Sequence, residues 1–389
     1  MEDRLSSLPE ELICHILSFL PTKQTIATSV LSKKWKPLWR SVPTLYFDDT
    51  NSSTRTKEDC ARIVQSVYAF INSRDQHQPI QNLRLTFNAR HYDPTSITEW
   101  VNVAVERKLQ HLDLSLGLHP INLSSIFTCT TLVVLKLQGL VFKPFLFYSV
   151  NLPFLKVLHL QLVSFSKCGC LAQLLSACPV LEDFKARCTV FKNYFTDREF
   201  RTLPKLVRAD ISMRNPHFLL MEVVNNVEFL RISQMDFIHQ HYGEGAGPYV
   251  LPMFHNLTHI ELVYTSSAND WLQVVVELLK HCPKLHVLVI NQEHFLGCMR
   301  DGFEEVGDWQ YPPFVPDNTL LFLKRCYLND YRGTKGEFQL ARYIMQNGRS
   351  LESMTICSSI DVNEQAKVKM LEKLSSCTRS SASCKLSIK

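Results

Sequence analysis

The apolar positions of this 389-residue chain form one short pattern, apolar-x-x-apolar-x-apolar, that recurs through the middle of the sequence. A short segment in which apolar and polar residues alternate is typical of a β-strand with one buried face. The copies begin at Ile80, Leu109, Leu132, Leu155, Leu181, Leu206, Val227, Leu257 and Leu285. The pattern therefore predicts a series of similar strands whose starts lie 21 to 30 residues apart.

A second repeated phrase stands between some of these strands. Residues 174–181 (LLSACPVL) and 278–285 (LLKHCPKL) match, and each indicates the end of a helix, a proline stop and the start of a strand. A period of about 20–29 residues is typical of leucine-rich repeats. We predict an α/β solenoid of irregular leucine-rich repeats over residues 79–310, with a parallel sheet on the concave face and helices outside. Unrelated amphipathic strands in an α/β sheet are the alternative.

The predicted concave face carries a row of mixed charge. Side chains alternate along a strand, so the leucines point inward and the residues between them face the open surface. A surface of this kind can select a protein partner by complementary charge, although for any single residue a solvated sheet face is the simpler interpretation. The central row includes Val289 and the candidate target-binding residues Arg84, Asp113, Lys136, His159, Lys185, Asp210, Arg231 and Glu261.

The first 45 residues predict three short helices. Ser7 and Glu10 have the spacing of a capping box at the start of the first helix, and Thr22 and Ser32 are candidate caps for the next two. The first helix has an apolar stripe made of Leu8, Leu12, Ile13, Ile16, Leu17 and Leu20. So small a unit cannot bury all its large apolar side chains, so the rest of the chain or another protein must cover the excess.

Composition narrows the class of protein without defining it. The chain is 46% hydrophobic and 20% charged with a formal net charge of +5, so a globular fold is expected and a nucleic-acid partner is not required. The N-terminus lacks the pattern of a secretory signal, and no apolar run has the length of a membrane span. Thirteen cysteines, an odd number spread over a long chain, indicate reduced and mostly packed thiols. We expect a cytoplasmic and/or nuclear protein without a membrane partner.

The N-terminal segment resembles a plant F-box, which we assign to residues 1–48. The resemblance rests on residues 8–12 (LPEEL), 16–23 (ILSFLPTK) and 28–39 (TSVLSKKWKPLW). It implies docking on the Skp-type adaptor of an SCF (Skp–cullin–F-box) ubiquitin ligase. The positions that the resemblance implies as adaptor contacts are Leu8, Pro9, Leu12, Ile16, Leu20, Pro21, Leu31 and Trp35. Some of these, together with Trp39, can instead hold the three helices together, and the sequence does not separate the two roles.

The C-terminal part resembles the FBD unit that ends many plant F-box proteins. The similarity lies in residues 331–333 (YRG), Glu337, residues 340–343 (LARY) and Asn347. We assign residues 311–359 to an FBD-like terminal repeat unit and 360–389 to a C-terminal helix and a tail that frays after residue 375. Residues 49–78 are expected to form a helical linker, with a helix over 57–74, that packs on the solenoid.

The sequence offers no convincing catalytic or metal site. Cys178 and Cys282 occupy the same place in the repeated phrase, which predicts packing and not reactivity. The pairs at 168–170 and 239–241 lack the second ligand pair of a structural zinc site. We predict no catalytic residue, no metal and no cofactor, although an anion held by Lys136, Lys185, Arg187, Arg208 and Arg231 is a further alternative.

The predicted function follows from the resemblance. It implies a non-catalytic subunit of a ubiquitin ligase that binds a Skp-type adaptor, and through it a cullin, with the F-box and an unknown target protein with the solenoid. A non-degradative scaffold that retains an F-box is the first alternative, and a cysteine hydrolase is a remote one.

Overall fold

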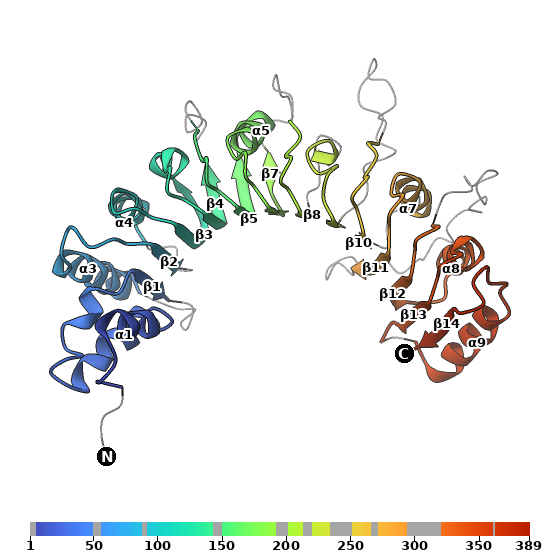
Figure 1. Ribbon diagram of the computed structural model, residues 1–389, viewed down its shortest axis with the longest axis horizontal. Coiled ribbons are helices and arrows are strands. Elements are labelled where there is room, and N and C mark those ends of the chain that lie inside the picture. Colours follow the sequence, from blue (N-terminus) through green and yellow to red (C-terminus); the bar gives the residue numbers. More distant parts are fainter. Residues whose placement is uncertain are drawn as a thin grey trace. The chain divides into compact units, whose positions relative to one another are not determined.

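The computed structural model describes residues 5–49, 56–87, 92–142, 150–191, 201–212, 220–233, 251–265, 271–293, 320–360 and 362–389. The chain comprises two compact units, Met1–Arg201 (unit 1) and Thr202–Lys389 (unit 2). In both units the strands are parallel and helices lie along one face of the sheet (Figure 1). The predicted α/β leucine-rich-repeat architecture is therefore confirmed.

Unit 1 begins with short helices and continues with alternating strands and helices. Its helical elements are α1 (Glu10–Leu17), α2 (Thr22–Ala27), η1 (Thr28–Val30), η2 (Leu38–Arg40), α3 (Lys57–Ser73), α4 (Pro94–Glu106), η3 (Ser124–Thr128) and α5 (Cys168–Ser176). Its strands are β1 (Thr44–Asp48), β2 (Asn82–Phe87), β3 (His111–Ile121), β4 (Val134–Phe142), β5 (Val157–Phe165), β6 (Asp183–Arg187) and β7 (Val190–Phe191). Strands β1 to β6 pair in chain order, and β7 pairs with β5.

Unit 2 continues the same arrangement. Its strands are β8 (Arg208–Ser212), β9 (Phe229–Ser233), β10 (His259–Thr265), β11 (Val287–Glu293), β12 (Arg325–Tyr331), β13 (Ser353–Ser358) and β14 (Lys385–Ile388). Its helices are α7 (Trp271–Lys280), α8 (Lys335–Asn347) and α9 (Glu364–Ser375). Strands β8 to β14 also pair in chain order, each parallel to the next.

Every predicted repeat segment contains a strand that begins two residues after the segment starts. Leu109, for example, precedes β3, which begins at His111. The first apolar residue of each phrase lies in the turn before the strand, where Leu109, Leu132 and Leu155 are fully buried. Within a strand the alternation holds, since Leu83 and Leu85 of β2 are buried while Arg84 between them is exposed. The sequence pattern therefore located the strands and their inward faces.

The repeated phrase at Cys178 and Cys282 has a packing role. Each thiol donates a hydrogen bond to the carbonyl four residues earlier, Cys178 Sγ to Leu174 O at 3.1 Å and Cys282 Sγ to Leu278 O at 3.2 Å. Burial raises the pKa of Cys178 to about 12 and also raises the pKa of Cys282. Both cysteines are protonated core residues at neutral pH, as the sequence predicted.

The N-terminal helices differ from the sequence prediction in how they are capped. Helix α1 starts behind Pro9 as N-cap, without a side-chain cap hydrogen bond, so the capping box expected from Ser7 to Glu10 is wrong. Proline has no N–H and a fixed φ, and the helix therefore begins directly after it. Thr22 does not cap α2 either; its buried hydroxyl accepts a hydrogen bond from the backbone N–H of Tyr46 at 2.8 Å.

The third predicted helix is replaced by turns that end in the 3-10 turn η2. Ser32 still accepts a hydrogen bond from the backbone N–H of Trp35 at 3.4 Å, which is the contact expected of a cap. Pro37 follows within the same segment and serves as the N-cap of η2. Because proline lacks a backbone donor, its position explains why no regular helix extends from Ser32 to Arg40.

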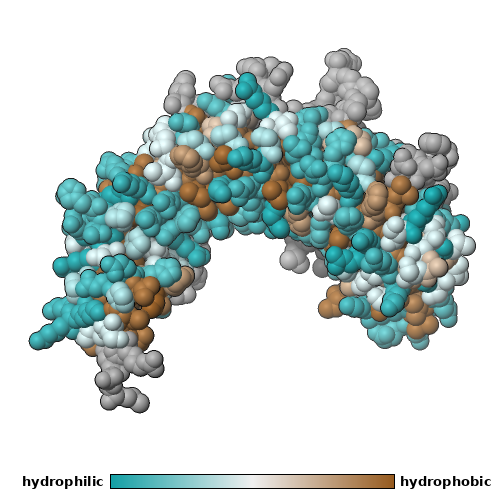
Figure 2. Space-filling model, viewed as in Figure 1, coloured by the Kyte–Doolittle hydropathy of each residue, from teal (hydrophilic) through white to brown (hydrophobic). Residues whose placement is uncertain are grey.

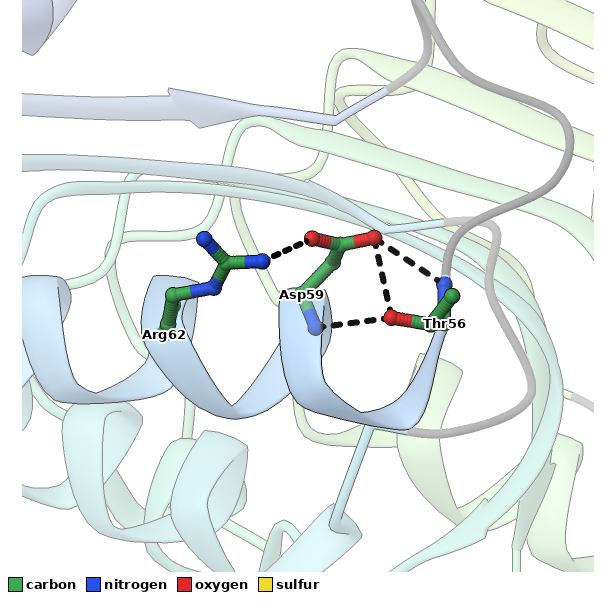
Figure 3. A network of polar contacts seen from close by, with 3 residues as sticks. All are labelled: Thr56, Asp59 and Arg62. Carbon is green, nitrogen blue, oxygen red and sulfur yellow. Dashed lines mark hydrogen bonds and ion pairs between the residues drawn. The ribbon is translucent and has the colours of Figure 1, made fainter.

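Helix α3 is the predicted linker helix and carries a complete capping box. Thr56 Oγ1 accepts from the Asp59 N–H at 3.2 Å, while the Asp59 carboxylate accepts from the backbone N–H and the hydroxyl of Thr56 (Figure 3). The same carboxylate pairs with Arg62 one turn later, at 2.6 Å. These bonds satisfy donors at the helix start and fix where α3 begins.

A buried arginine joins the N-terminal helices to the repeats within unit 1. Arg74, at the end of α3, donates to the carbonyls of Trp39 and Pro79 at 3.4 and 3.5 Å. Its guanidinium lies 5.9 Å from the centre of the Phe70 ring, which itself contacts Trp39 with ring centres 5.1 Å apart. Burial and the nearby charge of Arg107 lower the pKa of Arg74 to about 10, so it remains charged at neutral pH. This contact set connects the N-terminal helices at Trp39 to the end of α3, 35 residues later in the sequence.

The end of unit 2 is more ordered than the sequence suggested. The prediction that residues 375–389 fray is wrong, because β14 pairs with β13 and the Lys389 carbonyl accepts from the Ser358 N–H at 3.0 Å. The serine-rich composition of this tail led to the prediction of fraying. Leu386 and Ile388 nevertheless pair in register with Met354 and Ile356 of β13. Helix α9 and strand β14 thus add one more repeat after the FBD-like unit.

Glu337 organises the FBD-like unit. It is buried at the start of α8, where its carboxylate accepts from the backbone N–H groups of Arg332 and Thr334 at 3.1 and 2.9 Å. Its other oxygen accepts from the hydroxyl of Tyr264 on β10 at 3.2 Å. Burial and this carboxylate raise the pKa of Tyr264, which keeps the phenol protonated as a donor. Glu337 therefore ties α8 to a strand 73 residues away.

We expect Glu337→Ala to lower the free energy of unfolding by about 2–3 kcal/mol, because it removes a charged acceptor from several buried donors. Chemical denaturation monitored by circular dichroism measures the change. Glu277→Ala is the control; it removes a partly exposed carboxylate paired with Lys280 and should cost less than about 0.5 kcal/mol. Equal losses in both variants would contradict the structural role of Glu337.

Candidate protein-binding surfaces

The N-terminal helices enclose a small apolar core of their own. Ile13 and Leu17 of α1 are buried against Trp35, Leu38 and Val42. Leu8, Cys14 and Leu20 pack on this cluster and are half-buried. The core therefore uses only one side of α1.

Three hydrogen bonds from two side chains fix the N-terminal segment to the same core. The Trp35 indole N–H donates to Ser6 Oγ at 2.9 Å. The ammonium group of Lys34 donates to the carbonyls of Ser6 and Leu8, both at 2.7 Å. With only 6% of its surface exposed, Trp35 holds the helices together. We therefore remove it from the proposed adaptor contacts, among which the resemblance to an F-box had placed it.

The opposite side of α1 presents large apolar side chains to solvent. Leu12 and Ile16 are one turn apart on α1, and Phe19 lies in the turn directly after the helix ends at Leu17, where it is 75% exposed. Phe19 also contacts His15 edge-on, with ring centres 5.0 Å apart. Figure 2 shows apolar surface gathered on the N-terminal helices, in the region where Figure 1 labels α1.

A second exposed apolar group follows in α2 and η1. Ile26 and Val30 are one helical turn apart, and Leu31 comes next; Val30 is 85% exposed and Leu31 is 64% exposed. None of these three side chains belongs to the buried cluster. Exposed apolar residues that gather in one small segment are typical of an interaction site. We name the set Leu12, Ile16, Phe19, Ile26, Val30 and Leu31 the apolar docking surface.

The structure sorts the eight predicted adaptor contacts by exposure. Pro9, Leu12, Ile16 and Leu31 are exposed, Leu8, Leu20 and Pro21 are half-buried, and Trp35 is buried. Sequence reasoning did not place Phe19, Ile26 and Val30 among the contacts. Phe19 was detectable as a large apolar residue that follows the stripe of the first helix, whereas the exposure of Val30 depends on how η1 turns.

In unit 1 the predicted central row exists in register on the open face of the sheet. Arg84 pairs with Asp113, Asp113 with Lys136, Lys136 with His159, and His159 with Lys185. Tyr46 of β1 extends the row, and the Arg84 guanidinium lies 4.7 Å from the centre of its ring. The structure thus brings the five predicted unit 1 residues together as neighbours.

The charges of this row are partly compensated. Arg84 Nε lies 3.6 Å from Asp113 Oδ2, and His159 Nε2 lies 3.3 Å from Asp183 Oδ1. Lys136 is exposed, and its positive charge adds to partial burial in lowering the pKa of His111 on the adjacent strand. The row therefore becomes more positive toward β4 and β6.

In unit 2 the predicted residues form a compact ion network. Arg231 Nε lies 3.1 Å from Glu261 Oε1, and Arg231 Nη1 lies 3.9 Å from Asp210 Oδ2. Asn291 on β11 donates to the same Glu261 oxygen at 2.8 Å. Beside this row, the Arg208 guanidinium lies 4.5 Å from the centre of the Phe229 ring. The charges of the unit 2 row therefore neutralise one another within the row.

Two further buried cysteines of the described residues, Cys168 and Cys326, are poorly suited to nucleophilic catalysis. Burial raises the pKa of Cys168 to about 12 and also raises the pKa of Cys326, which disfavours the thiolate that nucleophilic attack requires. No cluster of three or more His, Cys, Asp or Glu side chains suited to a metal ion occurs in this part of the chain. A helix with the length and hydrophobicity to cross a bilayer is likewise absent from the described ranges.

Comparison with known proteins agrees with this architecture. Residues 5–46 match the F-box domain, residues 312–356 match the FBD, and residues 97–195 match the LRR repeats of FBD-associated F-box protein At5g56370. Three similar proteins of Arabidopsis thaliana align over nearly the whole chain.

F-box/FBD/LRR-repeat protein At4g00160 is 29% identical over 100% of this chain and 94% of its own length. FBD-associated F-box protein At4g10400 is 30% identical over 99% of both chains. FBD-associated F-box protein At5g60610 is 31% identical over 91% of this chain and 99% of its own length.

An F-box joined to stacked leucine-rich repeats defines the class of F-box/LRR proteins. With the FBD unit present and full-length similarity to its members, the chain belongs to the plant F-box/FBD/LRR-repeat family.

The variants Trp35→Ala and Phe19→Ser test whether Trp35 belongs to the F-box core and Phe19 to the apolar docking surface, and we expect them to differ in stability. Trp35→Ala should destabilise the F-box by about 3–5 kcal/mol, because it opens a cavity and removes the partner of Ser6. Phe19→Ser should change the unfolding free energy by less than about 0.5 kcal/mol, since its side chain is exposed. Thermal unfolding of the two variants tests the assignment, which a large destabilisation by Phe19→Ser would contradict.

Proposed function

We propose that this protein is the substrate-recognition subunit of an SCF-type ubiquitin ligase. Its F-box binds a Skp-type adaptor and, through it, a cullin. The open face of the repeats binds a target protein. Members of F-box/LRR families typically act as non-catalytic adaptors, and membership of this family supports the assignment.

The apolar docking surface is the observation that carries the proposal. The F-box completes its own core with Ile13, Leu17, Trp35, Leu38 and Val42, which leaves the docking surface without an internal role. Burying one large apolar side chain contributes about 1.5–3 kcal/mol, so a few of these residues can offset the cost of association, about 4–15 kcal/mol. Of the eight contacts predicted from the sequence, we retain Leu12, Ile16 and Leu31 as principal contacts and Pro9 as exposed beside them.

The proposed mechanism requires no bond to be made or broken by this chain. A target held on the repeats and a ubiquitin-loaded enzyme held through the F-box become parts of one complex, which raises their effective concentration. Arg74 supports this arrangement, because its bonds to Trp39 and Pro79 hold the F-box on the first repeat. A fixed spacing between the two binding surfaces favours repeated transfer to the same target.

The alternatives are distinguished by different observations. A non-degradative scaffold would bind the adaptor without recruiting a cullin. A cysteine hydrolase is disfavoured at Cys168, Cys178, Cys282 and Cys326, whose thiols all have raised pKa values from burial.

We expect the triple variant Leu12→Ser, Phe19→Ser and Val30→Ser to weaken binding of a purified Skp-type adaptor by at least about a hundredfold. The reason is that three exposed apolar side chains lose their burial at the interface while the F-box core stays intact. Isothermal titration calorimetry with the full-length chain measures the affinity.

The matched control carries Lys23→Ser and Lys36→Ser, two exposed polar positions of the same F-box. This variant should bind the adaptor within about threefold of the wild type. Undiminished binding by the triple variant would refute the interface, and absence of a cullin from the purified wild-type complex would favour the scaffold.

A further inference from the structure

The ends of neighbouring strands in unit 1 share an unusual backbone conformation, which also occurs at Cys188 directly after β6, with φ 49°. Leu118 of β3, Gly139 of β4 and Leu162 of β5 all have positive φ, at 61°, 69° and 53°. The residues that follow them, His119, Leu140 and Val163, pair with one another in register. The three positions therefore lie side by side across the sheet, with Gly139 in the middle.

Only glycine fits the middle position. A Cβ atom at Gly139 would lie 1.7 Å from the carbonyl oxygen of Leu116, because the register of β3 shifts between Ser115 and His119 at this point. No side chain can therefore stand between Leu118 and Leu162. The sheet presents two leucines with a glycine between them, which we call the leucine pair.

Both leucines are exposed at a conformational cost. Leu118 is 61% exposed and Leu162 is 42% exposed, although the next residue in β5, Val163, is fully buried. A left-handed backbone at a non-glycine residue costs about 1–2 kcal/mol. Strain of this kind is often retained where it serves binding. Because exposed leucines in a strained conformation contribute little to the core, these two are candidates for contact with a binding partner.

The rows beside the leucine pair are positively charged. On β4, β5 and β6 the central row is Lys136, His159 and Lys185, and the row next to the pair is Gln138, Gln161 and Arg187. These six described positions include three cations and no carboxylate. Gln138 and Gln161 are exposed and paired in register, so their amides are available to a peptide backbone.

We propose that the leucine pair and these rows bind an extended target segment in which an apolar side chain is flanked by carboxylates. The apolar side chain packs against the exposed Leu118 and Leu162, on either side of the buried Gly139. The flanking Asp or Glu side chains approach Lys136, Lys185 and Arg187, and complementary charge of this kind favours both encounter and specificity. The inference rests on the proposed function, in which this sheet face receives the target.

A random twelve-residue peptide library displayed on phage tests the proposal, with the purified full-length chain immobilised by itself; binding of a Skp-type adaptor is measured separately. We expect enrichment of peptides that contain a Leu, Ile, Met or Phe between Asp or Glu residues. The most enriched peptide is then synthesised with a fluorophore, and its affinity is measured by anisotropy at low and high salt.

Two double variants identify the site. Leu118→Asn with Leu162→Asn removes the apolar pair, and asparagine accepts positive φ, so the melting temperature should stay equal or rise while peptide affinity falls about tenfold or more. Lys136→Glu with Arg187→Glu should lower the affinity by at least about tenfold and reduce its salt dependence. The control, Phe154→Asn with Lys205→Glu, changes an exposed aromatic residue and an exposed lysine elsewhere and should bind like the wild type.

Several results would overturn the inference: no enriched peptide, enrichment of basic or uncharged peptides, or unchanged affinity in either test variant. The adaptor provides an independent readout. If the adaptor co-purifies with a cullin but the peptide results fail, the inference fails and the proposed function stands. If the acidic peptides bind as expected but no adaptor co-purifies, the proposed function fails while the peptide site remains.

Discussion

The stacking of parallel strands in register is the constraint on which this structure depends. Each repeat contributes an inward row of apolar side chains that a single strand cannot bury, so every strand needs a neighbour on both sides. In β2 and β3, Leu83 pairs with Leu112 and Leu85 with Leu114, and all four are buried. The same register that aligns the leucines also aligns the polar residues between them, so core packing determines the composition of the open face.

The F-box has two roles that follow from this constraint. It covers the exposed edge of β1, where the Thr22 hydroxyl accepts a hydrogen bond from the Tyr46 N–H, a backbone donor that would otherwise face solvent. Its own core uses one side of α1, and the opposite side carries the apolar docking surface. One small helical unit thus closes the first repeat and presents a surface for another protein.

The described part of the FBD unit continues the parallel sheet. Glu337 caps α8 and accepts from Tyr264, and the strands β12 and β13 continue the sheet in register. The buried carboxylate of Glu337 therefore helps to hold this unit together. The open face is less uniform, because the charges of Asp210, Arg231 and Glu261 satisfy one another whereas the rows on β4 to β6 have an excess of cations.

The sequence by itself determined the repeat, the positions of the nine strands that follow the repeated pattern and the central row of the open face, because alternation along a strand and a regular period are local properties of the chain. It also indicated that the first helices have more apolar residues than they can bury. Tertiary structure alone decided that Trp35 is core and Phe19 is surface, since both are large apolar residues and only packing separates them. It also decided that Leu118 and Leu162 stand beside Gly139 in a strained backbone, because that arrangement arises from a shift in register between strands and has no signature in either strand alone.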